Sequence, residues 1–203
     1  MISKILFQTS KRPPSEKIVE KLKQYIGPDW DYLHFTDQDV INFFIEHPID
    51  GFEAIQDKFH SFKNGAHKAD LFRYYFLYLN GGVFIDSDAL LNCDIESIVN
   101  KYSFFSVNSS VHPKTIFQGF IGASPGHPIV FRALMDAYNI NLNSLDDNYH
   151  LMCKNLYDII EYSDQRNTML YIEAFKDDRT YSVLDHLGNE ILFHYWKTKI
   201  IDI

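Results

Sequence analysis

Hydrophobic and polar positions alternate along the chain with two periods, one typical of strands and the other of helices. Short apolar runs such as Ile5–Phe7 predict buried strands. Longer segments in which apolar residues recur on one face predict helices. The first half is expected to contain, in order, a strand over 5–7, a helix over 15–25, a strand over 30–35, a helix over 37–46, a helix over 66–79 and a strand over 83–85.

The second half has a weaker pattern. It predicts an apolar segment over 104–107, a strand over 116–121, a helix over 128–138, a mostly helical polar stretch over 140–180 and a last strand over 190–196. Strands that alternate with helices favour an α/β fold, here an α/β/α sandwich with a mainly parallel central sheet. We expect one domain over residues 1–203, and leave open whether further domains follow residue 203.

The segment over 66–79 is apolar nearly all round, which is typical of a buried helix. His67, Asp70 and Arg73 interrupt it at intervals of three residues and therefore share one face. Because both flanks of this stripe are aromatic and buried, we expect the stripe to line a cleft. The alternative is an Asp70–Arg73 surface pair, worth roughly 0.2–0.5 kcal/mol.

The pattern Asp-x-Asp occurs three times, at 29–31, 37–39 and 86–88. The first two are expected to be surface turn and helix-cap residues. Asp86 and Asp88 follow the apolar strand over 83–85, and open α/β sheets bind ligands at the carboxyl ends of their strands. Two adjacent carboxylates repel each other unless a cation joins them, and such oxygen ligands suit Mg²⁺ or Mn²⁺. A pair of solvated turn aspartates is the alternative.

Composition narrows the choice of function. Hydrophobic residues make up 46% of the chain, which excludes a disordered protein. A net charge of −8 without any Lys/Arg run argues against a nucleic-acid partner, and implies that a phosphorylated substrate needs local cations or a metal. Cys93 and Cys153 are too few for a disulfide framework and are expected to be free, buried thiols. No run approaches the roughly 20 apolar residues of a membrane span, so a soluble, cytoplasmic protein is expected.

The run Ala69-Asp70-Leu71-Phe72-Arg73-Tyr74, followed by Gly81-Gly82 and Asp86-Ser87-Asp88, resembles the signature of the DxD sugar transferases of glycosyltransferase family 32. Residues 4–9, 28–32 and 122–128 are also similar to segments of that family. The resemblance is densest over 4–90. In its short length the chain also resembles glycosyltransferase domains encoded by chlorella viruses, which would place it in the host cytoplasm.

This resemblance implies a GT-A-like fold, a nucleoside-diphosphate-sugar donor (UDP-linked by expectation), a glycan or other hydroxyl acceptor, and Mn²⁺ or Mg²⁺. It implies catalytic roles for Asp86, Asp88 and Arg73. The donor would contact Gln8, Thr9, Ser10, Asp70, Arg73, Asp86, Ser87 and Trp196, and the metal would bind Asp86, Asp88 and His194. An ordinary alternating strand over 192–196 is the alternative for the last segment.

Two other functions stay open at this point. A phosphatase of the haloacid dehalogenase class also places Asp-x-Asp after an apolar strand, with the first Asp as nucleophile. A catalytically inert module with the same fold could bind a sugar or nucleotide without transferring it. The sequence leaves open the sugar, the acceptor, the stereochemistry, any catalytic base and the oligomeric state.

Overall fold

The computed structural model describes residues 1–176 and 180–194, and these contain a nine-stranded sheet in the order β2-β1-β3-β6-β5-β7-β8-β9-β4. The strands are β1 (Ile5–Thr9), β2 (Asp31–Phe35), β3 (Gly82–Ile85), β4 (Ala89–Leu91), β5 (Phe104–Asn108), β6 (Ile116–Ala123), β7 (Thr168–Phe175), β8 (Tyr181–Leu184) and β9 (Glu190–His194).

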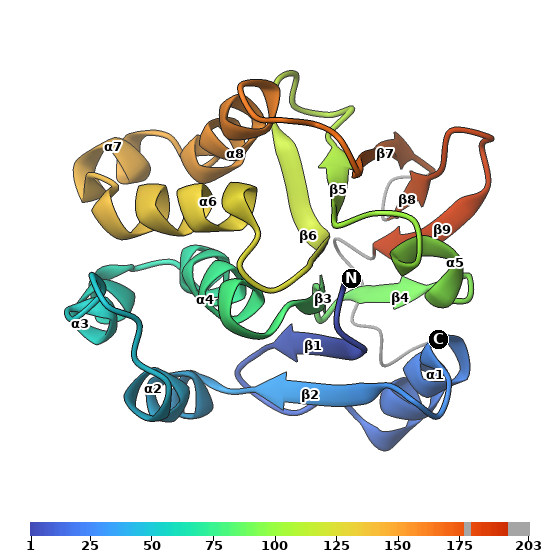
Figure 1. Ribbon diagram of the computed structural model, residues 1–203, viewed down its shortest axis with the longest axis horizontal. Coiled ribbons are helices and arrows are strands. Elements are labelled where there is room, and N and C mark those ends of the chain that lie inside the picture. The colour runs from blue at the N-terminus through green and yellow to red at the C-terminus, as the bar shows by residue number, and fades with distance from the viewer. Residues whose placement is uncertain (177–179, 195–203) are drawn as a thin grey trace.

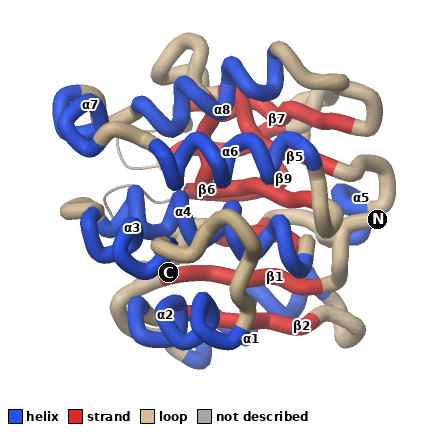
Figure 2. The backbone as a smooth tube through the Cα atoms, turned by 60° about the vertical axis from the view of Figure 1, so that its left-hand side comes forward, coloured by secondary structure: helices blue, strands red, loops and turns tan. Residues whose placement is uncertain are grey.

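Helices cover both faces of this sheet, as Figures 1 and 2 show. They are α1 (Glu16–Ile26), α2 (Asp37–Glu46), α3 (Ile55–Ser61), α4 (Gly65–Asn80), α5 (Glu96–Val99), α6 (Pro128–Asn139), α7 (Leu142–Asp147) and α8 (Leu151–Glu161). Helices α1 and α5 pack on one face and the others on the opposite face. The three layers are those of the predicted α/β/α sandwich.

Strand pairing is parallel in the β2-β1-β3 unit and between β5 and β7. It is antiparallel where β6 joins β3 and β5, and throughout β7-β8-β9-β4. The predicted α/β class is therefore confirmed, with parallel pairs in the β2-β1-β3 unit and between β5 and β7, and with antiparallel pairs at β6 and beyond β7 that the sequence pattern does not reveal.

Alternation along the central strands divides the apolar residues between two cores. On β1, Leu6 packs into the core beneath α1 and α5, whereas Phe7 packs into the core beneath α2 and α4. The second core is rich in aromatic pairs, such as Phe7 with Phe76 at a ring-centroid distance of 4.3 Å. These two cores hold β1 and β3 in place. They therefore fix the end of β3, which the Asp86–Asp88 segment follows.

Most predicted elements appear within a few residues of their expected ends. The capping box at the start of α2 is present, with the Thr36 hydroxyl accepting from the Asp39 N–H and the Asp39 carboxylate accepting from the Thr36 N–H. The prediction of a mostly helical 140–180 is wrong in its second half, where β7 lies. On β7 Ile172 is exposed and Glu173 is buried, so the usual link between polarity and burial is reversed there.

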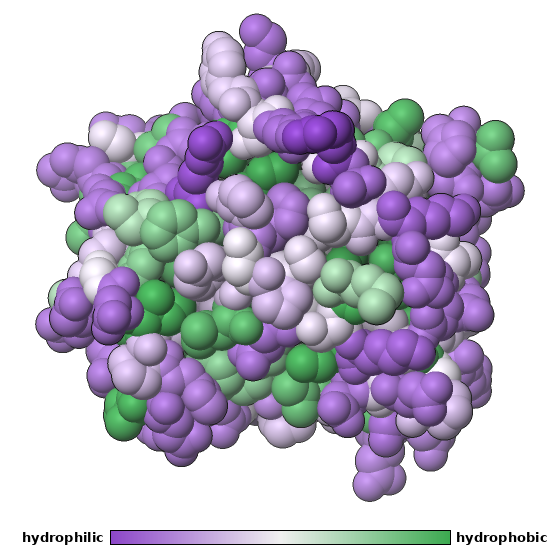
Figure 3. All heavy atoms as spheres, in the orientation of Figure 1, coloured by the Kyte–Doolittle hydropathy of each residue, from purple (hydrophilic) through white to green (hydrophobic). Residues whose placement is uncertain are grey.

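On the face shown in Figure 3, hydrophobic side chains form several separate groups among hydrophilic ones. None of the helices in the described part of the chain combines the length and apolar character that crossing a bilayer requires.

Candidate functional site

The Asp86–Asp88 segment leaves the sheet directly after β3 and is held by its backbone. The Asp86 N–H donates to the carbonyl of Gly119 on β6 at 2.8 Å. The Asp86 carbonyl accepts from the Gln8 side-chain amide and from the Ala89 N–H, both at 3.0 Å. Contacts with β6, β1 and the start of β4 therefore fix this turn, and both aspartates lie on the wall of a cavity.

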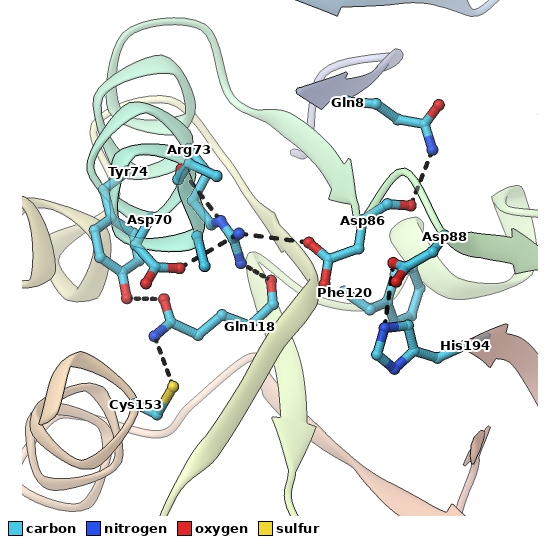
Figure 4. A network of polar contacts seen from close by, with 12 residues as sticks. Gln8, Asp70, Arg73, Tyr74, Asp86, Asp88, Gln118, Phe120, Cys153 and His194 are labelled. Atoms are coloured by element: carbon cyan, nitrogen blue, oxygen red, sulfur yellow. Dashed lines mark hydrogen bonds and ion pairs between the residues drawn. The ribbon is translucent and has the colours of Figure 1, made fainter. Parts of the chain in front are cut away.

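His194 reaches the same place from the other end of the chain. Strand β4 begins one residue after Asp88 and pairs with β9, so that Ala89 lies opposite His194. The His194 Nε2 lies 3.2 Å from Asp88 Oδ1, and Figure 4 shows the imidazole facing the carboxylate. Ligand atoms of Asp86, Asp88 and His194 all lie within 4.8 Å of one another, a group that could hold a metal ion.

The chemistry of these three side chains fits a divalent cation. Two carboxylates and an imidazole are ligands that Mn²⁺ accepts, and Mg²⁺ shares the preference for carboxylates. The His194 Nδ1 is buried, and the described residues give it no hydrogen-bond partner. The nitrogen that faces the carboxylates is Nε2, so Nε2 is the ring atom that could bind a cation there, while the ring itself packs on Phe117 at a centroid distance of 4.8 Å.

Electrostatics at the site are governed by burial and by the grouping of like charges. Burial raises the pKa of Asp86. The positive charges of Arg73 and His194 oppose this shift, and the negative charge of Asp88 adds to it. Burial alone lowers the pKa of His194, but its hydrogen bond to Asp88 and the charges of both aspartates outweigh this effect and raise the pKa. A cation between these groups would relieve the repulsion that raises the pKa of Asp86.

Arg73 lies between two carboxylates at the edge of the site. Its Nη2 is 3.3 Å from Asp70 Oδ1 and 3.5 Å from Asp86 Oδ1, as Figure 4 shows. Its Nη1 donates to the Gln118 carbonyl, and its guanidinium lies 4.1 Å from the centre of the Phe84 ring. The Asp70–Arg73 pair is therefore buried and not the surface pair that was the alternative. Arg73 links α4 to Asp86.

Helix α4 presents this polar face because its two ends are fixed. The Asn64 side chain caps its start by accepting from the Ala66 N–H. Gly81 ends it with φ 68°, a conformation that favours glycine, and a Cβ on Gly81 would lie 2.6 Å from Pro125 Cδ. With both ends set, His67, Asp70 and Arg73 face the same cavity as Asp86.

A cavity of about 1090 Å³ adjoins the site and is large enough for a nucleotide-sugar. The predicted residues on its wall are Thr9, Ser10, His67, Asp70, Arg73, Asp86, Ser87, Asp88 and His194. Gln8 is fully buried and is not on this wall; its amide bonds the Asp86 carbonyl and the Tyr32 hydroxyl instead. Trp196 lies outside the described residues.

Several residues around the cavity were not predicted from the sequence. Gln118 is buried on β6, where its amide oxygen accepts from Tyr74 and its nitrogen lies 3.3 Å from the Cys153 sulfur. Burial raises the pKa of Cys153 to about 12, and both cysteines are free and half-buried. A Cβ on Gly119 would lie 2.3 Å from Asp86 Oδ2. A polar Gln118-Gly119 pair inside an apolar strand was the available signal.

The first two Asp-x-Asp copies are surface turn and helix-cap residues, as expected. Asp29 is in a surface turn and Asp39 belongs to the α2 cap, while Asp37 is an exposed residue at the start of α2 that borders the cavity and pairs with Lys68. Residues 15–105 match the family described as a glycosyltransferase sugar-binding region containing a DXD motif, and Asp86-Ser87-Asp88 is the copy whose two aspartates both line the cavity. The resemblance to DXD-motif glycosyltransferases is confirmed.

Curated relatives of this DXD-motif chain are similar over part of their length. Inositol phosphoceramide mannosyltransferase 1 of Schizosaccharomyces pombe is 26% identical over 55% of this chain and 33% of its own. Mannosyl phosphorylinositol ceramide synthase SUR1 of Saccharomyces cerevisiae is 29% identical over 66% of this chain and 34% of its own. The chain thus spans about a third of the length of these relatives.

A solved structure, the PaToxG glycosyltransferase, has a similar fold. It aligns with a TM-score of 0.54 and 12% identity over 78% of this chain and 69% of that one. At this identity the likeness concerns the fold alone. It agrees with the predicted GT-A-like arrangement of the DXD-motif chain.

Proposed function

We propose that this chain transfers a sugar from a nucleoside-diphosphate-sugar to a hydroxyl acceptor, with a divalent metal bound by Asp86, Asp88 and His194. One observation carries the proposal: the DXD carboxylates and a histidine from the far end of the chain meet on the wall of a cavity large enough for the donor. The family match over 15–105 supports the same reaction.

Different residues would contact the diphosphate, the sugar and the nucleoside of the donor. Asp86, Asp88 and His194 would hold Mn²⁺ or Mg²⁺, which stabilises negative charge on the leaving diphosphate when bound. Arg73 keeps the Asp86 carboxylate in place and adds positive charge near it. Asp70 accepts from sugar hydroxyls, while Thr9, Ser10 and Ser87 contact the nucleoside side. Gln8 supports Asp86 from beneath through the backbone.

The relatives suggest which donors to test first. Both are named for mannosyl transfer, so a hexose, and mannose in particular, is our choice of sugar. The sequence favoured a UDP-linked donor, so GDP-mannose, UDP-glucose and UDP-galactose form the minimal set. The acceptor hydroxyl belongs to a glycan or to a polyol headgroup.

A donor-cleavage assay tests this proposal against its two alternatives. We expect release of nucleoside diphosphate with Mn²⁺ and none after chelation with EDTA, because the leaving diphosphate then lacks its counter-charge. Hydrolysis of p-nitrophenyl phosphate without donor cleavage would instead support the phosphatase. Donor binding by calorimetry without cleavage of any nucleotide-sugar would support the inert module.

A further inference from the structure

Glu173 is a buried carboxylate that the chemistry proposed above does not use. It lies on β7, lines the cavity and is only 6% exposed. Ser109, the residue after β5, donates its hydroxyl to Glu173 Oε2 at 2.6 Å. Within the described residues Glu173 forms no ion pair, and its Oε1 has no hydrogen-bond partner.

Such a carboxylate is unfavourable unless something compensates for its burial. Removing a charge from water carries a large penalty, and a single hydroxyl donor offsets only part of it. Buried carboxylates in cavities are therefore candidates for functional groups. A ligand that donates a hydrogen bond to Oε1 would complete the coordination of Glu173.

The strand register places Glu173 on the same side of the sheet as His194. Glu173 pairs with Val183 on β8, and Tyr181, two residues before Val183, pairs with His194 on β9. Paired residues and residues two apart on one strand share a face, so Glu173, Tyr181 and His194 all point the same way. All three line the cavity. Glu173 therefore borders the same cavity as His194 and Arg73.

We propose that Glu173, oriented by Ser109, binds the acceptor: its free carboxylate oxygen accepts the hydrogen bond of an acceptor hydroxyl beside the donor sugar. This inference rests on the proposed function and deepens it by assigning the second substrate a place. A carboxylate is acceptor-only, so it selects hydroxyl donors and disfavours phosphate. Hydrogen bonds to a charged group are stronger than neutral ones, which suits a residue that orients a weakly held polyol.

The test compares transfer with donor cleavage in the same preparations. Donor cleavage is followed as nucleoside diphosphate release without acceptor, and transfer is followed with octyl glycosides, methyl α-mannoside and myo-inositol as acceptors. In Glu173→Gln we expect the KM for the acceptor to rise by about 10-fold or more, since a charge-assisted bond is replaced by a neutral one. The KM for the donor should stay within about twofold, because the proposed function assigns the donor to the Asp70, Arg73 and Asp86 side of the cavity.

Two further variants separate positioning from binding. Ser109→Ala removes the donor that orients Glu173 and should raise the acceptor KM by a few-fold only. Glu161→Gln, an exposed glutamate at the end of α8, is the matched control and should leave every constant unchanged.

Each remaining outcome decides the question. An unchanged acceptor KM in Glu173→Gln overturns the inference, as does an equal rise in donor and acceptor KM, which indicates a structural role. A wild type that cleaves the donor but transfers to none of these acceptors also overturns it. A wild type that cleaves no donor with Mn²⁺ defeats the proposed function itself, and the inference falls with it.

Discussion

The two sides of the candidate site differ in how far they are buried. On the α4 side, Asp70 and Arg73 are closed in by the helix, the Phe84 ring and β6, and only 4% of the Arg73 side chain is exposed. On the β9 side, the Asp88 side chain is 43% exposed, while His194 is 12% exposed and has a buried ring nitrogen with no described partner. Asp86 lies between these sides and contacts Arg73.

Because of this difference in burial, substitutions on the α4 side should affect chiefly the stability of the fold, and substitutions on the β9 side should affect chiefly ligand binding. The polar groups on the α4 side satisfy one another, so a change there leaves a buried charge without its partner. Those on the β9 side face the cavity with unused bonding capacity, so a change there affects chiefly a ligand. The loss in free energy of unfolding is therefore expected to be larger for changes on the α4 side than for changes on the β9 side.

Arg73→Ala should be the most destabilising change. It leaves Asp70 and Asp86 buried without the cation between them, and breaking such a pair from one side costs about 3–5 kcal/mol. Urea unfolding followed by tryptophan fluorescence measures it. Arg132→Ala, which removes an exposed arginine bonded to Ser163, is the control and should stay within about 0.5 kcal/mol. A loss below about 1 kcal/mol for Arg73→Ala would contradict the buried-pair account.

Gly119→Ala should cause the second-largest loss in free energy of unfolding and should also weaken Mn²⁺ binding. The added Cβ would lie 2.3 Å from both Asp86 Oδ2 and the Phe117 ring, so the structure must shift, which typically costs about 1–3 kcal/mol. Because Asp86 moves, Mn²⁺ binding should weaken as well. Gly65→Ala, with open space around its Cβ, is the matched control and should leave both quantities nearly unchanged. Unaltered Mn²⁺ affinity in Gly119→Ala would show that Asp86 is not a ligand.

Glu96→Gln tests an ion pair outside the cavity, the one between Lys4 and Glu96, for comparison with the buried pairs of Arg73. Hydrogen bonds from Lys4 and Trp30 hold the pKa of Glu96 at about 2. A depressed carboxylate pKa stabilises the fold above the ordinary pKa of about 4.5 and loses that effect as pH falls toward about 2. The variant should be slightly less stable than wild type at pH 7, and the two should converge near pH 2. A difference that persists at pH 2 would mean that packing and not charge is responsible.

Asp88→Asn should change stability least, within about 1 kcal/mol, because the side chain is half exposed and the amide keeps its shape. It should nevertheless weaken Mn²⁺ binding at least about 10-fold and abolish donor cleavage, since a charged ligand is lost. Calorimetry with Mn²⁺ measures the first effect. Asp29→Asn, from another Asp-x-Asp copy, should bind Mn²⁺ as wild type does. Equal affinity in both variants would sink the metal assignment.

The sequence predicted the α4 side of the candidate site better than the β9 side. Helix α4 and strand β3 were readable because their apolar residues are dense and are bounded by Gly81-Gly82. The His67, Asp70 and Arg73 stripe stood out against that background, and its face on the cavity followed from helical spacing. The position of His194 next to Asp88 was expected from the family resemblance and from alternation on the last strand.

Other features were not readable because they depend on tertiary pairing. Strand β7 has an exposed Ile172 and a buried Glu173, so its local pattern points to the wrong faces. Gln8 followed a strand and was expected near the nucleoside, yet Tyr32 and the Asp86 backbone take both ends of its amide. Neither partner is near Gln8 in the sequence, so no local signal marks this arrangement.

The pairing of β4 with β9 makes the order of synthesis matter for the site. Strand β4 follows the Asp86–Asp88 turn at once, but its strand partner in the described sheet is β9, about half of the chain later. Contacts between residues so far apart form late, after the entropy of closing a long loop has been overcome. A nascent chain that has emerged only as far as α8 can assemble α4 and β3, yet it presents the two aspartates without their histidine. With the metal site proposed above, strong cation binding would therefore require the pairing of β4 with β9, and a chain that lacks β9 would bind the cation weakly.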